Sequence, residues 1–146
     1  MFNKMKIING EGLLLGRLAG EVAKGVLRGE EYAIVNCEKI VISGKPELVV
    51  AREAQRRLRK GYPPKSQKLS RRPDFFVRRT IRGMLPRKKE RGIEALKRIR
   101  CYTSLPQELA SKNLETIALA HSQKLPTRKK ITVGEVCRAL GGNIRT

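Results

Sequence analysis

The chain has 146 residues, 40% of them hydrophobic, and a formal net charge of +20, so its length suits a single domain, 1–146, with one modest core. A compact chain this basic repels itself, which favours a polyanionic partner, nucleic acid ahead of an anionic membrane. No apolar run approaches the roughly 18 residues that span a bilayer, and the N-terminus lacks the apolar segment of a secretory signal, so we expect a cytoplasmic protein without a membrane partner.

Strands and helices alternate along the first hundred residues. The first predicted helix carries an apolar stripe at four-residue spacing, from Leu14 to Val26. Pro46 and Glu47 mark the first turn of the second helix. This alternation predicts an α/β fold with helices on both faces of a sheet. The predicted strands are 6–9, 32–35, 40–42 and 99–102, and the predicted helices are 13–28, 43–60, 73–85 and 87–97.

The chain also contains a basic loop and a C-terminal tail. Residues 61–73 are basic, contain prolines and show no periodicity, which predicts an extended loop. Such a segment can become ordered inside RNA. The tail, from about 104 to 146, contains one more helix, because Thr132 and Glu135 have the spacing of a capping box. Gly141 follows the last apolar residues and is expected to end it.

The cysteines are widely separated. Cys37, Cys101 and Cys137 form no Cys-x-x-Cys pair, which excludes a zinc ribbon. Each stands in an apolar segment, so we expect buried free thiols. His121 is the only histidine and Asp74 the only aspartate, so no Ser-His-Asp set exists. The sequence therefore predicts no metal, no cofactor, no small-molecule substrate and no enzymatic activity.

Three glycines follow the first strand. Gly10, Gly12 and Gly16 stand where dinucleotide-binding folds place their phosphate turn, but their spacing is one residue longer than that fingerprint. Asn36 stands where such folds carry an acid. A tight strand-to-helix turn is the better interpretation, and in one variant Arg17 and the helix N-terminus meet an RNA phosphate. The alternative is a small Rossmann-like nucleotide-binding or RNA-modifying enzyme.

The charge is concentrated in the middle of the chain. Between Arg52 and Arg100 stand nineteen basic residues and four acidic ones, a local balance of +15. Solvated helix faces usually mix charge signs, so this imbalance predicts polyanion binding. The few aromatic residues form no stacking pattern, and helix-turn-helix and zinc-finger patterns are absent. Folded RNA, held through its phosphates and shape, is the expected partner.

Several stretches resemble one family over nearly the whole chain. They are Leu14–Ala19, Val35–Lys39, Ile42–Gly44, Arg72–Pro73 and Val77–Pro86, the last ending in the specific Arg-Gly-Met-Leu-Pro run. With them the chain resembles the universal large-subunit ribosomal protein L-thirteen family. The tail segments 114–121 and 132–136 are similar to its archaeal branch.

The resemblance implies a three-layer α/β/α domain with a four-stranded, mainly parallel sheet, a basic extended loop and a C-terminal helical tail. It implies a structural constituent of the large ribosomal subunit that binds and helps fold large-subunit rRNA, beside neighbouring ribosomal proteins. A free RNA-binding regulator is a further alternative. With Arg17 from the glycine turn, the expected RNA-binding residues are Arg56, Arg57, Arg59, Lys60, Lys65, Lys68, Arg71, Arg72, Arg78, Arg79, Arg82, Arg87, Lys88 and Lys89.

Overall fold

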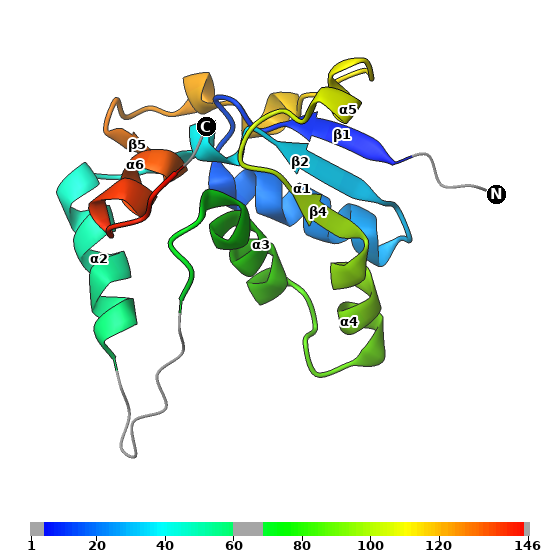
Figure 1. The fold of residues 1–146 in the computed structure, drawn as a ribbon, viewed down its shortest axis with the longest axis horizontal. Helices are drawn as coiled ribbons and strands as arrows, with labels where there is room; N and C mark the ends of the chain where they lie inside the picture. The colour runs from blue at the N-terminus through cyan, green and yellow to red at the C-terminus, as the bar shows by residue number, and fades with distance from the viewer. Residues whose placement is uncertain (1–4, 60–68, 145–146) are drawn as a thin grey trace.

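A computed structural model describes residues 5–59 and 69–144 (Figure 1). At its centre is a parallel three-stranded sheet in the order β1–β2–β4, made of β1 (Lys6–Asn9), β2 (Tyr32–Val35) and β4 (Ile99–Cys101). All three strands lie where the sequence predicts them. Parallel neighbours need crossover connections, and helices provide these connections here. The α/β class is therefore confirmed.

One face of this sheet carries the main core. Side chains alternate between the faces of a strand, so Ile8, Ile34 and Ile99 point to the same side. There they pack against α1 (Leu15–Leu27) and α3 (Pro73–Met84), which also contact each other. Figure 1 shows both helices on the same side of the sheet. The predicted basic helix α3 is thus also part of the core on its inner side.

Helix α1 follows from its four-residue apolar spacing. Leu18, Val22 and Val26 have no exposed surface, because this spacing places them on one helix face. Burying each such side chain contributes about 1.5–3 kcal/mol relative to leaving it exposed. Arg28 caps the helix, and Gly29 ends it with a positive φ of 101° that suits glycine. The predicted core stripe is confirmed.

The other face of the sheet is covered more thinly. Ile7, Ala33 and Val35 point to this side and form a small cluster with Leu109 of the short helix α5 (Gln107–Ala110). In Figure 1, α5 lies on the opposite side of the sheet from α1 and α3. The sheet thus has helices on both faces, but the two helical layers are unequal.

The expectation of a four-stranded sheet is wrong, because the main sheet has three strands. The strand predicted at 40–42 forms as β3 (Val41–Ser43), but it leaves the main sheet. It pairs antiparallel with β5 (Lys130–Thr132), with Ile42 opposite Ile131. The turn before it redirects the chain, because Asn36 adopts a left-handed conformation and the 3-10 helix η1 (Cys37–Lys39) follows. The partner strand lies in the tail, where the sequence indicates only a helix.

Two further helices flank the main body. α2 (Pro46–Leu58) packs against α6 and β5, and α4 (Glu90–Lys97) packs against α1 and β4. Pro46 occupies the first turn of α2, as predicted, because its missing N–H would be unpaired there in any case. α4 begins later than expected because a turn precedes it, with the Lys89 N–H donating to the Pro86 carbonyl over 3.0 Å.

Only the end of the predicted loop 61–73 lies within the described residues. Residues 60–68 lie outside them, while 69–72 form an irregular segment that leads into α3. Pro73 stands in the first turn of α3, as predicted, and the helix ends at Met84, before Pro86.

The tail ends in α6 (Val133–Ala139), which begins at the predicted capping box. The Glu135 N–H donates to the Thr132 hydroxyl over 3.2 Å, and the Thr132 N–H donates to the Glu135 carboxylate over 3.0 Å. Two 3-10 helices, η2 (Ala118–Ala120) and η3 (Ser122–Lys124), precede it. Within the described ranges, no helix is long and apolar enough to span a membrane.

The three thiols are free, as predicted. Cys37 and Cys137 are buried, and Cys101 is half-buried. A hydrogen bond with Cys101 and burial raise the pKa of Cys37 well above its usual value, and burial raises the pKa of Cys137 to about 11. Both buried groups therefore stay protonated and unreactive near neutral pH.

Candidate nucleic-acid interface

Helix α2 is mostly exposed and buries only two side chains. These are Val49 and Glu53, which lie on one face because they are four residues apart. Glu53 is 3% exposed, although a buried carboxylate is costly unless it is paired and hydrogen-bonded. The surroundings of Glu53 therefore determine how the arginines near it are arranged.

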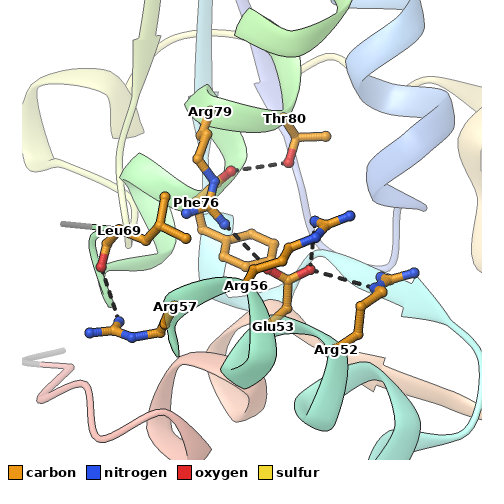
Figure 2. A network of polar contacts seen from close by, with 8 residues as sticks. All are labelled: Arg52, Glu53, Arg56, Arg57, Leu69, Phe76, Arg79 and Thr80. Carbon is orange, nitrogen blue, oxygen red and sulfur yellow. Dashed lines mark hydrogen bonds and ion pairs between the residues drawn. The ribbon is translucent and has the colours of Figure 1, made fainter. Parts of the chain in front are cut away.

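Three arginines converge on Glu53 (Figure 2). On α2, Arg56 Nη1 lies 3.0 Å and Arg52 Nε 3.6 Å from the carboxylate Oε1. From α3, Arg79 Nη2 lies 3.4 Å from Oε2. One negative charge thus holds three positive ones, which leaves a local excess of two. We call these four residues the Glu53 cluster.

Arg79 is held by two contacts. Its guanidinium lies 5.1 Å from the centre of the Phe76 ring, a cation–π distance, and it also donates to the Glu53 carboxylate. Partial burial lowers the pKa of Arg79, and the charge of Glu53 opposes that shift. A guanidinium fixed in this way loses little freedom when it binds an anion.

Helix α3 carries the next arginines. Phe75, Arg78, Arg79 and Arg82 recur at three- and four-residue spacing along one side of the helix. They line a groove of about 580 Å³ that Leu96 of α4 helps to enclose. Arg78 is half-buried and donates to the Leu96 carbonyl over 3.4 Å, whereas Arg82 is exposed.

The basic surface continues from α3 onto the turn before α4. Arg82 also borders a second hollow, of about 340 Å³, together with Arg87 and Lys88. Both of these residues and Lys89 are exposed. The structure therefore joins Arg56, Arg79, Arg78, Arg82, Arg87 and Lys88 into one continuous surface, which we call the basic track.

Arg57 and Arg59 lie on α2 beside the track. Arg57 is half-buried and donates to the Leu69 carbonyl over 3.0 Å, which ties α2 to the segment before α3. Arg59 caps the C-terminus of α2 and is exposed. Lys60, Lys65 and Lys68 lie outside the described residues.

Two arginines before α3 make contacts of a different kind. Arg71 is exposed and donates to the Gly141 carbonyl in the tail over 3.4 Å. Arg72 precedes the helix, donates to the Asp74 carboxylate over 2.7 Å and lies 4.9 Å from the centre of the Phe75 ring. Both remain exposed enough to meet a partner.

Comparison with known proteins places the chain in a family. Residues 3–108 match the model of the family described as ribosomal protein L13.

The chain belongs to the ribosomal protein L13 family.

Three relatives, each named large ribosomal subunit protein uL13, cover the tail as well. The protein of Methanocaldococcus jannaschii is 44% identical over 140 residues, which are 94% of this chain and 98% of that protein. The protein of Methanopyrus kandleri is 40% identical over 137 residues, 92% and 86% of the two chains. The protein of Methanococcoides burtonii is 40% identical over 142 residues, 94% and 98%. All three organisms are archaea, which confirms the resemblance to the archaeal branch.

In this L13-family chain, Arg17 lies apart from the basic track. Its guanidinium donates to the Leu119 carbonyl of the tail over 3.3 Å. The backbone N–H groups of the glycine turn before it donate to carbonyls of the protein itself. The N–H of Gly12 donates to Lys39 over 3.3 Å, and that of Leu14 donates to Ala120 over 2.7 Å. These amides are therefore not available to a phosphate, and a role for Arg17 in RNA binding stays a prediction.

The sequence does not single out Glu53 and Phe75, which shape this L13-family surface. Glu53 appears in the sequence as one of four acids among nineteen bases, and only its spacing from Val49 hints at burial. Phe75 belongs to no aromatic pattern, yet it is 47% exposed beside the groove. Within residues 5–59 and 69–144, no three His, Cys, Asp or Glu side chains are grouped to hold a metal ion.

Proposed function

We propose that this chain is a structural constituent of the large ribosomal subunit, where it binds large-subunit rRNA and helps it fold during assembly. It acts without catalysis, in the cytoplasm, beside other proteins of the subunit. The observation that carries the proposal is the basic track, in which basic residues from two helices and a turn form one surface. The buried Glu53 holds two of its arginines, Arg56 and Arg79. The names of the relatives support the same role.

The chemistry of the basic track suits phosphates more than bases. Guanidinium groups match phosphate oxygens in geometry and charge, and contacts to the backbone hold RNA without reading its sequence. The Glu53 cluster supports this reading, because it fixes Arg56 and Arg79 before the RNA arrives. We therefore propose binding through phosphate and shape contacts, as expected for structured RNA.

The proposed RNA-binding residues fall into two groups. Arg82, Arg87, Lys88, Lys89 and Arg59 are exposed and are proposed to reach phosphates directly. The remaining described residues have protein partners as well and are proposed to bind RNA while they hold the surface in shape. They are Arg56, Arg57, Arg71, Arg72, Arg78 and Arg79, together with Arg17, which lies apart from the basic track.

Fractionation of a cell lysate tests the function as a whole. The protein, detected by quantitative mass spectrometry, is expected in the large-subunit peak of a sucrose gradient at one copy per subunit, and to stay there after a moderate salt wash. Recovery mainly in the light fractions, free of large subunits, would contradict a structural role and favour a free RNA-binding regulator.

A further inference from the structure

The groove beside α3 combines charge with an exposed aromatic ring. Arg78, Arg79 and Arg82 line it, and none of the described residues around it is acidic. Phe75 and Leu96 supply the apolar part of its walls. The volume, about 580 Å³, falls within the range of pockets that bind small molecules, roughly 300–1,000 Å³.

Binding of phosphates by the arginines does not explain why the Phe75 ring is exposed. A phenylalanine usually buries its ring, but 47% of Phe75 is exposed, on the side of α3 that also carries Arg78, Arg79 and Arg82. The Arg72 guanidinium lies 4.9 Å from the centre of its ring. This guanidinium lies over the ring and not in the groove, and an aromatic ring that lines a basic groove is a surface on which a nucleobase can stack.

From this geometry we infer that the groove binds one unpaired nucleotide of the RNA. Its base contacts Phe75 and Leu96, and its phosphate is held by Arg78 and Arg82. The inference rests on the proposed function and deepens it, because it names the part of the RNA that this site takes.

An RNA duplex alone would use only half of this site. Its phosphates are outside and would meet the arginines, but its bases are paired and stacked inside, so Phe75 would face water. An unpaired nucleotide offers both an anionic phosphate and a free π-face. A protein segment bearing carboxylates would also satisfy the arginines, but a carboxylate offers no flat ring to stack on Phe75.

Three RNA hairpins test the preference directly. One carries a single-nucleotide bulge, the second carries the same bulge without its base, and the third is fully paired. The protein is expected to bind the bulged hairpin roughly fivefold or more tightly than the other two, which is the usual contribution of stacking one base on an aromatic ring. Equal affinity for all three hairpins would overturn the inference.

Two variants assign the preference to the groove. Phe75→Ala is expected to bind all three hairpins equally while it keeps the wild-type affinity for the paired one. The control is Leu48→Ala, which removes an apolar side chain that is 64% exposed at the start of α2, outside the groove. It should keep the preference. Circular dichroism checks that both variants are folded, and an unchanged preference in Phe75→Ala would contradict the inference.

Ultraviolet cross-linking in purified large subunits separates this inference from the proposed function. The peptide that contains Phe75 is expected to carry a nucleotide adduct after irradiation and digestion. If the protein is present in the subunits but this peptide is joined to another protein, or carries no nucleotide while other peptides of the chain do, the groove assignment fails and the function stands. If the protein is absent from the subunits, the proposed function itself fails.

Discussion

Arg79 of α3 donates to Glu53 of α2 over 3.4 Å, and this ion pair links two helices that share only part of their packing. Both helices contact α6, but α2 also packs on β5, whereas α3 packs mainly on α1 and β4. The Glu53 side chain is only 4% exposed and that of Arg79 is 29% exposed. The pair therefore fixes the spacing between two rows of arginines, and both stability and RNA binding should depend on it.

Glu53→Gln should weaken RNA binding even though it raises the net charge by one. A model based on charge alone predicts tighter binding, because less negative charge faces the phosphates. If Glu53 positions Arg56 and Arg79, the variant should instead bind RNA less tightly, because both guanidinium groups lose their fixed position. The free energy of unfolding should also fall by about 1–3 kcal/mol, because a half-buried guanidinium loses its partner. Filter binding and urea unfolding measure the two effects.

The matched control for that variant is Glu94→Gln. It adds the same charge, but Glu94 is an exposed residue of α4 outside the Glu53 cluster. This control should bind RNA as well as the wild type or slightly better. Tighter binding by Glu53→Gln than by Glu94→Gln would show that Glu53 does not position the arginines.

Arg82→Gln and Arg79→Gln should separate binding from folding. Arg82 is exposed, so its replacement should change the free energy of unfolding by no more than about 0.5 kcal/mol. Arg79→Gln should cost clearly more, because Glu53 loses a partner across the helix pair. Both variants should bind RNA less tightly. Equal melting temperatures for the two variants would contradict the structural role of Arg79.

Leu18→Ala should lower the stability of the protein and leave its RNA affinity unchanged. Leu18 has no exposed surface under α1, so the substitution leaves a cavity that costs roughly 2–5 kcal/mol of unfolding free energy. The RNA affinity of the folded protein should stay at the wild-type value, since the basic track lies elsewhere. Circular-dichroism melts and binding assays well below the melting temperature measure both quantities. A large loss of affinity in the folded variant would place RNA contacts on α1.

Affinity for rRNA fragments should fall steeply as salt rises. Each phosphate that the protein neutralises contributes roughly −0.7 to −0.9 to the slope of log affinity against log salt. Removing one phosphate contact with Arg82→Gln should reduce the slope by about that amount. Titrations at several salt concentrations give both slopes, and a wild-type slope near zero would exclude charge as the main source of binding.

The local sequence determined much of this protein. The stripe of α1, the strands of the parallel sheet and the capping box of α6 follow from residues that are neighbours along the chain. The concentration of charge between Arg52 and Arg100 needs no structure to be seen. The sequence also located Arg78, Arg79 and Arg82 on one helix, because α3 starts at its proline and ends before the next.

Tertiary structure alone decided how these parts are used. β3 pairs with β5 rather than with the main sheet, and its partner lies in the tail, about ninety residues further along the chain. Burial of Glu53 depends on which face of α2 turns toward α3, and Arg79 is held only because of that choice. The tail covers the glycine turn by two backbone hydrogen bonds, from Ser122 N–H to the Gly12 carbonyl and from Leu14 N–H to the Ala120 carbonyl. All three features come from contacts between distant segments, for which neighbouring residues carry no periodic signal.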